Sequence, residues 1–287
     1  MDDSSDELLA GVRVVSMAVN LPGPVAAHRL RGLGASVTKV EPPSGDPLSL
    51  VAPEYYAHLA AGQDVVALDL KSTAGSERLH TLLQDADLLV TSHRPRALAA
   101  LGLDWEDLHA RHPHLSQVAI TGSPGEAADT PGHDLTYQAA AGTIARHDGV
   151  PVMPTLPAAD LGGAERAVAD GIAAVLRAQR TGQGHHVEVA LSGVVDDFAA
   201  STRCGLSGPG TILGGGYPLY GIYPASDGFV AVAAIEPHFA AALAALMGEE
   251  SAFEVTAEDL REFFAAGTLE HWSRWAREHD LPVAPLR

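Results

Sequence analysis

The sequence predicts an α/β fold in which a large domain with a doubly wound, mostly parallel sheet is joined to a smaller second domain. Short β-branched runs alternate with helix-like segments through the first half of the chain, and such spacing is typical of parallel sheets. Near residue 200 a loop-rich stretch begins, and a hairpin pattern follows it. We therefore expect a large domain over residues 1–200 and a smaller one over 201–287.

Each expected strand is a short run rich in valine, isoleucine or threonine. These runs cover residues 12–18, 36–41, 64–70, 87–92, 116–121 and 185–191. Helices are expected between them over 23–35, 76–86, 96–102 and 104–111. Apolar residues at helical spacing predict one long helix over about 160–184, ended by Gly182. In the smaller domain, "YGIYPASDGFVAVAAIEPHF" predicts a hairpin followed by a helix that starts at Pro237.

Composition narrows the class of protein. The chain has 287 residues, 46% of them hydrophobic, which is enough for a sizeable core. Its 36 acidic and 18 basic residues give a net charge of −18, which disfavours nucleic acid and anionic membranes as partners. The apolar runs are too short for a membrane span. A single cysteine, Cys204, and an acidic start without a secretory signal lead us to expect a cytoplasmic protein.

Several common site motifs are missing from the sequence. No G-x-G-x-x-G or Walker loop follows a predicted strand, and there is no G-x-S-x-G nucleophile elbow. Histidines cluster at 109, 112 and 114 and at 185–186. Because no H-E-x-x-H or paired C-x-x-C accompanies them, we expect no metal site.

Three residues have both a structural and a catalytic interpretation. In "PGHDLTYQAAAG" (131–142), Asp134 is a suitable helix N-cap, which leaves His133 without a structural role. Asp160 opens the long helix, where a cap is expected and the helix dipole would lower its pKa. Gly162 and Gly163 follow it and suggest close access to the backbone. Glu236 precedes a helix and carries little weight alone. Residue patterns by themselves leave these alternatives open.

A family resemblance favours the catalytic interpretation. The segment "LLAGVRVVSMAVNLPGPVAAHRLRGLGASVTKVEPPSGDP" is similar to the opening of the type III CoA-transferase family (CaiB/BaiF type), which includes the α-methylacyl-CoA racemases. The blocks "VVALDLKSTAG", "HRPRALAALGL", "PGHDLTYQAAAG", "RTGQGHHVEVAL" and "YGIYPASDGFVAVAAIEPHF" resemble later family blocks in the same order. Gly-His-Asp, an aspartate at the start of the long helix and Ile-Glu-Pro together resemble the racemase branch.

The resemblance assigns roles to individual residues. It implies that His133 and Asp160 transfer protons and that Glu236 orients the histidine. It further implies substrate contacts by Lys39, Arg94, Tyr137, Gly215 and Gly216. No cofactor is implied, because a coenzyme A thioester is the substrate itself. The family fold also implies a homodimer of two interlocked chains.

The implied chemistry is physically reasonable. Inverting a carbon next to a thioester needs a base on one face and an acid on the other, and the resulting enolate needs donors at the thioester oxygen. We expect the N–H groups after Asp160 to supply them. The sequence carries Gln63-Asp64 where the family has an Arg/Lys pair, a change that removes charge-assisted contacts to phosphate.

Four hypotheses therefore stay open. The first is an isomerase of 2-methylacyl-CoA-type thioesters. The second is a CoA transferase with Asp160 as nucleophile, and Gly214–Gly216 resemble the glycine loop of that branch. The third is a His/Asp acid–base enzyme that acts on a CoA-free or carrier-bound small molecule, and the fourth is an inactive binding protein.

Overall fold

A computed structural model describes residues 8–286. The chain divides into two compact units, Met1–Ala199 and Ala200–Arg287. The predicted domain boundary after residue 200 lies one residue from this division. Most of the acidic start of the chain, for which no secretory signal is expected, lies outside the described residues. We describe each unit by itself.

Within the described part of unit 1, six strands form one sheet in the order β3-β2-β1-β4-β5-β8, and every adjacent pair is parallel. The strands are β1 (Arg13–Ser16), β2 (Ser36–Glu41), β3 (Asp64–Ala67), β4 (Leu88–Thr91), β5 (Ser116–Thr121) and β8 (His186–Ala190). This confirms the predicted α/β fold with a parallel sheet. The strand order reverses between β1 and β4, and ligands of such sheets bind at the carboxyl ends beside that reversal.

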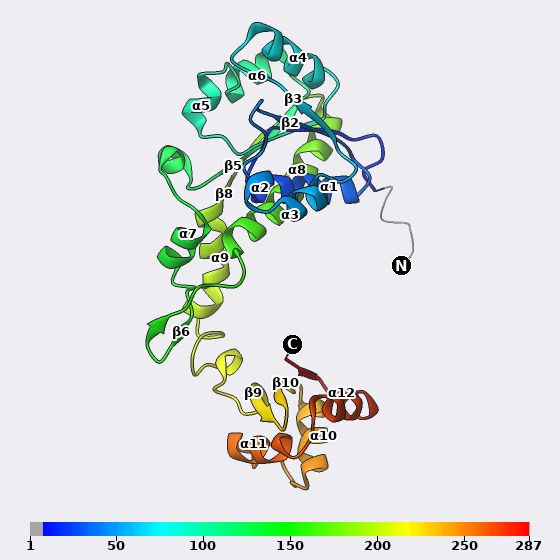
Figure 1. Cartoon of the computed structure of the whole chain (residues 1–287), viewed down its shortest axis with the longest axis vertical. Coiled ribbons are helices and arrows are strands. Elements are labelled where there is room, and N and C mark those ends of the chain that lie inside the picture. Colours follow the sequence, from blue (N-terminus) through cyan, green and yellow to red (C-terminus); the bar gives the residue numbers. More distant parts are fainter. Residues whose placement is uncertain (1–7, 287) are drawn as a thin grey trace. The chain divides into compact units, whose positions relative to one another are not determined.

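Helices connect these strands (Figure 1). They are α1 (Pro22–Gly32), α2 (Leu48–Val51), α3 (Pro53–Ala60), α4 (Thr73–Leu83), α5 (Pro95–Ala99), α6 (Trp105–Arg111), α7 (Asp134–Ala141), α8 (Ala158–Thr181) and α9 (Leu191–Arg203), with a 3₁₀ turn η2 (Gly125–Asp129) and a small hairpin of β6 (Arg146–His147) and β7 (Val150–Pro151). The helices α2, α3 and α9 are absent from the sequence prediction. Helix α8 ends at Thr181, and Gly182 is its C-cap as predicted, in the left-handed conformation at φ 72°.

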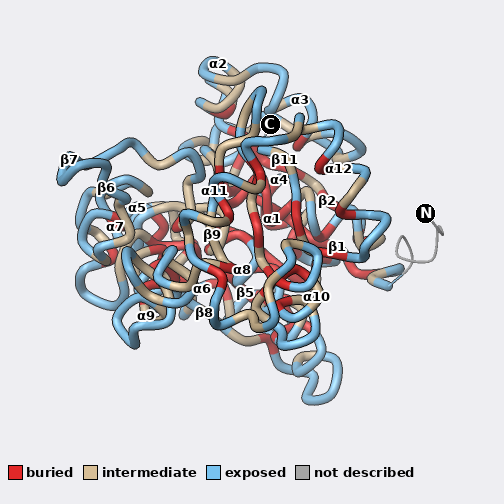
Figure 2. Tube along the Cα trace, turned by 90° about the horizontal axis from the view of Figure 1, so that it is seen from below, coloured by how far each residue is buried: buried red, intermediate tan, exposed pale blue. Residues whose placement is uncertain are grey.

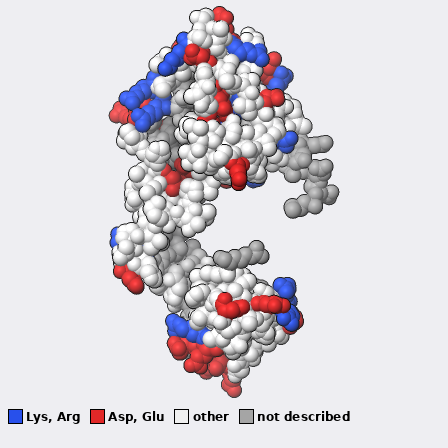
Figure 3. Space-filling view, in the orientation of Figure 1, with Lys and Arg blue, Asp and Glu red and all other residues white. Residues whose placement is uncertain are grey.

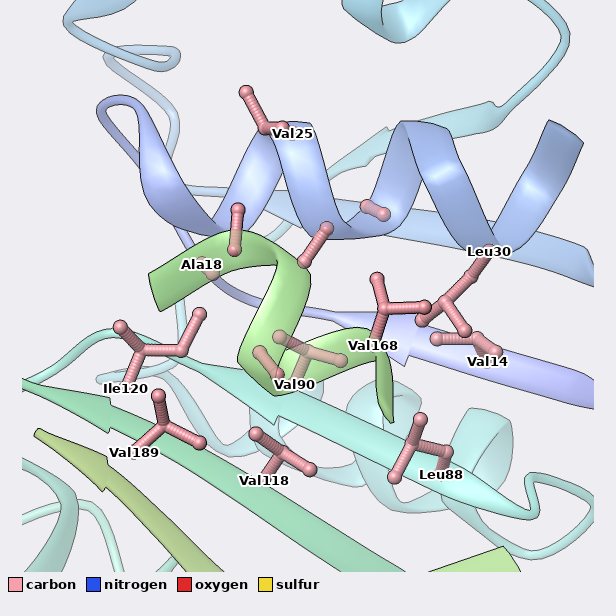
Figure 4. Packing of buried hydrophobic residues seen from close by; sticks show 14 of the residues in the cluster. Val14, Ala18, Val25, Leu30, Leu88, Val90, Val118, Ile120, Val168 and Val189 are labelled. Carbon is pink, nitrogen blue, oxygen red and sulfur yellow. The ribbon is translucent and has the colours of Figure 1, made fainter. Parts of the chain in front are cut away.

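Alternate side chains of the strands face two different helix layers. Val14, Val90 and Val118 point to the layer of α1 and α8, and the close-up in Figure 4 shows Leu30 of α1 and Val168 of α8 on the side of the sheet where Val14 lies. The neighbouring strand positions turn to the layer of α4, α5 and α6. The buried parts of the trace in Figure 2 follow these strands and α1, whereas the β6–β7 hairpin is exposed.

The two glycines of the first turns of α8 have a packing role. A Cβ built on Gly162 would lie 2.4 Å from the ring of Phe198, and one built on Gly163 would lie 2.2 Å from Leu191. Both contacts belong to α9, the helix that the sequence did not predict. The close backbone access expected at these glycines is therefore used by a neighbouring helix.

Unit 2 has its own core. The predicted hairpin forms from β9 (Tyr220–Ala225) and β10 (Gly228–Ala233), and β11 (Val283–Pro285) pairs with β10. A 3₁₀ turn η3 (Ile212–Gly214) precedes them, and α10 (Pro237–Met247), α11 (Ala257–Ala265) and α12 (Leu269–Glu278) complete the unit. Helix α10 begins at Pro237 as predicted. Aromatic rings from α11 and α12, including Phe264 and Trp272, fill the core.

Charge is distributed unevenly over the surface. Figure 3 shows basic side chains gathered around α5 on unit 1, where Arg96 lies 3.7 Å from Asp129, and acidic ones around α11 on unit 2. No helix within residues 8–286 has the length and apolar character needed to cross a bilayer.

Candidate active site

A pocket of about 230 Å³ lies at the carboxyl ends of β1, β4 and β5 in unit 1. Loops after these strands contribute Val19, Asn20, Ser92 and Arg94, with Thr121 and Gly122 at the end of β5. The starts of α7 and α8 close the other side. Four of the eight predicted site residues line this pocket: His133, Asp160, Arg94 and Tyr137.

His133 is the N-cap of α7, with extended dihedrals of φ −141° and ψ 166°. Its carbonyl accepts hydrogen bonds from the backbone N–H groups of Thr136 at 2.8 Å and Tyr137 at 3.2 Å, and its own N–H donates to the Thr136 hydroxyl at 3.1 Å. The backbone therefore does the capping. The imidazole makes no capping hydrogen bond among the described residues, so it remains available to the pocket.

Asp134 caps a different helix from the one predicted. It is the first residue of α7, not its N-cap, and its Oδ1 accepts from the N–H groups of Ala159 at 2.7 Å and Asp160 at 3.2 Å in the first turn of α8. Its Oδ2 accepts from the Gln138 amide at 2.7 Å. Because Pro157 is the N-cap of α8, the predicted capping role of Asp160 is wrong. Asp134 thereby fixes the start of α8 against α7.

The pKa of Asp160 moves in the opposite direction from the sequence prediction. Burial, and then the negative charge of Asp134, raise the pKa of this carboxyl from 3.8 to about 6, while His133 acts to lower it. A helix N-terminus would stabilise an anion. Here Asp134 occupies that position and accepts the free N–H groups, so Asp160 gains little from the dipole and is repelled by its neighbour.

The backbone N–H after Asp160 is not available as an oxyanion donor. The Leu161 N–H already donates to the Pro157 carbonyl at 2.9 Å. The expectation that this part of the backbone would polarise a thioester oxygen is therefore wrong for Leu161. Side chains of the pocket take its place as candidate donors.

Tyr137 is one such donor. Its buried ring is seated against two glycines, since a Cβ on Gly132 would lie 2.5 Å from the ring and one on Gly122 would lie 2.1 Å from the hydroxyl. Burial and the Asp160 carboxylate raise the pKa of this phenol, against the opposing effect of Arg94. The hydroxyl thus keeps its proton at neutral pH and can donate a hydrogen bond.

Arg94 is the second donor and the cation of this pocket. It is the N-cap residue of α5, directly after the loop that leaves β4, and its side chain is exposed at the pocket. The planar guanidinium offers several N–H groups that can donate together.

Lys39 lies outside this pocket. It is 1% exposed, and its Nζ donates to Glu41 Oε1 and Asp46 Oδ2, both at 2.6 Å, 4.8 Å from the centre of the Tyr56 ring. Its charge is thus matched within the fold, and the predicted contact of Lys39 with substrate gains no support. Asp46 also accepts from the N–H of Asn20 at 3.1 Å, and so connects this ion cluster to the pocket wall.

The remaining predicted residues belong to unit 2. Glu236 is exposed and serves as the N-cap of α10. Gly215 is left-handed at φ 85°, and a Cβ on Gly216 would lie 2.2 Å from the Gly210 carbonyl oxygen. These glycines therefore permit a tightly folded loop. The predicted roles of all three toward substrate stay predictions.

A larger cavity of about 550 Å³ lies at the carboxyl ends of β2 and β3. The loops after four strands contribute Met17, Pro42, Lys71 and His93 to its lining. Lys71 is an exposed cation at this cavity. The Gln63-Asp64 substitution lies at the opposite, amino end of β3, so it removes no cation from this edge of the sheet.

Asn20 and Lys71 are two lining residues that sequence reasoning did not single out. Asn20 lines the smaller pocket and has a φ of 71°, which is uncommon for a residue other than glycine. Lys71 lines the larger one. Each lies within two residues of the end of a predicted strand, and that position at the carboxyl end was the signal that could have identified them.

The reversal point of a parallel α/β sheet is a typical place for a small-molecule site, and the pocket there contains a histidine and an aspartate. Comparison with known proteins gives the class: CoA-transferase family III matches residues 9–287. The chain belongs to this family.

Relatives within the family include both transferases and a racemase. The chain is 32% identical over 251 residues to a succinate–glutarate CoA-transferase of Agrobacterium fabrum, covering 78% of this chain and 62% of that protein. It is 42% identical over 195 residues to a succinyl-CoA:(R)-benzylsuccinate CoA-transferase subunit of Thauera aromatica, covering 62% and 47%. It is 31% identical over 303 residues to the α-methylacyl-CoA racemase of Mus musculus, covering 97% and 77%. The chain thus spans about half to two thirds of the first two relatives.

Solved structures agree with the fold. A hypothetical protein of Mycobacterium tuberculosis superposes with a TM-score of 0.83 at 24% identity, covering 96% of this chain and 83% of that one. A CaiB/BaiF family protein of Brucella suis gives 0.80 at 25% identity, covering 97% and 84%.

Proposed function

We propose that this protein is an isomerase that inverts the α-carbon of a 2-methylacyl-CoA-type thioester by proton transfer between His133 and Asp160. The observation that carries the proposal is that both residues line one pocket, where the Asp160 pKa of about 6 lies close to neutrality. General acid–base catalysis is most efficient when the pKa of the catalytic group is near the operating pH. An aspartate with an ordinary pKa would be a poor proton donor at pH 7.

In the proposed reaction one of the two residues removes the α-proton, and the C–H electron pair moves into an enolate whose charge rests on the thioester oxygen. The other residue then delivers a proton to the opposite face of the same carbon. Net atoms and charge are unchanged, and the two residues exchange roles with the other enantiomer. Arg94 and the Tyr137 hydroxyl are the proposed donors to the enolate oxygen, because charge that develops in a reaction is stabilised by preset donors.

The larger cavity is the proposed binding place for the coenzyme A portion. It shares the loops after β1 and β4 with the smaller pocket, and it offers Lys71 to a phosphate. Met17 and Leu68 give it apolar surface for a flat ring system. The thioester is substrate, so the proposal needs no resident cofactor.

A homodimer is part of the proposal. Large apolar side chains of unit 1 are exposed, among them Val150 at 65%, Met153 at 72%, Leu156 at 65% and Phe198 at 51%. Apolar surface of this kind marks protein contacts. A second copy of the chain is the proposed cover, and Glu236 is the proposed partner of His133 in the assembled site.

CoA transfer is the second candidate function. The relatives named CoA-transferases are 32% and 42% identical to this chain, which favours it. In that reaction the Asp160 carboxylate would attack the acyl carbon, expel the CoA thiolate and form a mixed anhydride. A carboxyl with a pKa of about 6 is mostly ionised at pH 7.5, so its charge state also permits this step.

The test is incubation of a single enantiomer of a 2-methylacyl-CoA in deuterium oxide. The isomerase proposal expects deuterium at the α-carbon of both enantiomers. His133→Ala and Asp160→Ala should each abolish inversion, whereas Asp170→Ala, on the same helix but outside the pocket lining, should not.

Three other outcomes would contradict the isomerase proposal. Loss of activity after treatment with hydroxylamine in the presence of acyl-CoA, with the covalent modification located on Asp160, would identify the transferase. Calorimetry that detects no binding of coenzyme A or its thioesters would contradict both CoA reactions and leave the CoA-free acid–base enzyme or the inactive binding protein. Inversion that persists in both alanine variants would remove the two residues from the mechanism.

A further inference from the structure

A third cavity, of about 210 Å³, has no part in the proposed reaction. Its floor is the sheet face opposite to α8, where Gln117 and Ala119 of β5 stand beside His186 and Glu188 of β8. Their strand neighbours Val118 and Val189 point to the other face. The cavity roof comes from α5 and the start of α6, with Leu98 and Trp105.

The cavity contains buried polar atoms without partners. Gln117 is 1% exposed, and its Oε1 has no hydrogen-bond partner among the described residues. His93 Nδ1, also at this cavity, is buried and unpaired within the same described part of the chain. A buried amide oxygen without a partner is costly, and such atoms are normally satisfied by protein, water or ligand. Gln117 can only accept at this atom, so its missing partner is a hydrogen-bond donor.

The charges at the cavity have one sign. Glu188 holds its position through hydrogen bonds from the Thr121 hydroxyl at 2.9 Å and the Gly125 N–H at 3.3 Å, both to Oε1. Asp104 adds a second carboxylate, which caps α6 through the Asp107 N–H at 3.0 Å. No Lys or Arg of residues 8–286 lines the cavity. Burial lowers the pKa values of His93 and His186, so neither histidine supplies a counter-charge at neutral pH.

We propose that this cavity binds a small primary ammonium compound with a short apolar body. The ammonium group would donate to Gln117 Oε1 and to the Glu188 carboxylate, and the body would lie against Leu98 and Trp105. Three requirements meet in this ligand class: donors for an unpaired acceptor, a positive charge for the carboxylates, and apolar surface for the roof. An anion such as phosphate would not supply the positive charge that the carboxylates require.

The cavity that would hold this ligand shares a side chain with the proposed active site. Thr121 lines both this cavity and the pocket of His133 and Asp160, and its hydroxyl donates to Glu188. His93 lines both this cavity and the larger one. A bound amine would therefore contact side chains shared with both neighbouring cavities. The proposal does not depend on which reaction the His133–Asp160 pocket performs.

The test compares three probes with the same carbon skeleton: butylammonium, butanol and butyrate. Binding is followed through the indole N–H resonance of Trp105 in the whole protein, assigned by its loss in Trp105→Phe. We expect butylammonium to bind with a Kd on the order of a few mM, typical of so small a ligand. Butanol should bind at least about tenfold more weakly, and butyrate should not shift the resonance.

Two variants and a matched control complete the test. Glu188→Gln keeps an acceptor for Thr121 and should weaken butylammonium binding by about tenfold or more, the loss expected for a charge-assisted contact. Gln117→Met should weaken it similarly, and the Glu188 variant carries the test alone if the Gln117 variant fails to fold. Glu126→Gln removes the same charge from an exposed position outside the lining and should change nothing.

Several results would overturn the proposal. One is equal binding of butyrate and butylammonium. Another is an unshifted Trp105 resonance with every probe, which would mean that the unpaired atoms are met by water. A third is an equal loss of butylammonium affinity in the Glu126 and Glu188 variants, which would mean that the ligand is attracted by the net negative charge of the protein and not by the cavity.

Discussion

The ionised Asp160 carboxylate is expected to lower the stability of the folded state at neutral pH. Its pKa is about 6 in the folded chain, against 3.8 for an ordinary aspartate, because burial and Asp134 disfavour its charge. Between these two pKa values the folded state binds more protons than the unfolded state. Stability attributable to this carboxyl is therefore present below pH 3.8 and is lost as the pH rises through 6.

The magnitude follows from the same pKa values. The interval between 3.8 and about 6 corresponds to about 3 kcal/mol at about 1.36 kcal/mol per unit. Asp160 is only partly buried, and solvent on its open side reduces the expected effect to about 1.5 kcal/mol. Asp160→Asn, which removes the charge but keeps the shape, should raise the free energy of unfolding at pH 7.5 by this amount.

Urea unfolding of both proteins between pH 3.5 and 8 measures the difference. The advantage of Asp160→Asn should vanish near pH 3.8, grow to pH 6 and stay constant above it. Asp170→Asn on the same helix serves as the control and should follow the parent protein. A difference that is constant with pH, or a carboxyl carbon resonance of Asp160 that titrates near 4, would refute the reasoning.

Three further changes test the other contacts. Lys39→Met leaves the carboxylates of Glu41 and Asp46 buried without a cation, so it should lower the free energy of unfolding by about 3–5 kcal/mol in denaturant. The same substitution at the exposed Lys71 should lower it little. His112 lies 3.0 Å from His80, and burial lowers its pKa to about 4, so the unfolded state binds more protons between 6.5 and 4. Stability should therefore fall by up to about 3 kcal/mol as the pH drops through this range, and His112→Gln should flatten that part of the profile. Gly132→Ala puts a methyl group 2.5 Å from the Tyr137 ring and should lower the free energy of unfolding by about 1–3 kcal/mol. Because the ring must shift, the rate of α-proton exchange should fall at least about tenfold. Unchanged exchange would contradict the proposed role of the Tyr137 hydroxyl.

Local patterns were sufficient for the parallel sheet, whereas the site residues were singled out by the family resemblance, and four of the eight line one pocket. The strand over 116–121 was predicted to the residue, because a short run that contains valine, isoleucine and threonine between turns is typical of a strand. The sequence also brought His133 and Asp160 forward as a pair, and both line one pocket. Helix α9 was missed because its polar residues and glycine dilute the apolar periodicity over 191–203.

The remaining differences between sequence and structure concern interactions between distant segments. Asp134 has a suitable position to cap its own helix, but its carboxylate reaches the first turn of α8, 25 residues away. Nothing in the local sequence reveals that choice. Lys39 likewise looks like a free cation in sequence, and only the loop that carries Asp46 and the neighbouring Glu41 shows where its charge is matched.

The Asp134 contact connects folding and chemistry in one residue. By accepting the N–H groups of Ala159 and Asp160, its carboxylate fixes the start of α8 and so the position of the Asp160 side chain. The same negative charge is a cause of the raised Asp160 pKa. A neutral asparagine could accept the same two N–H groups with its side-chain oxygen, but it would remove the charge that raises the Asp160 pKa. The anion at this position therefore serves the helix start and the protonation of Asp160 together.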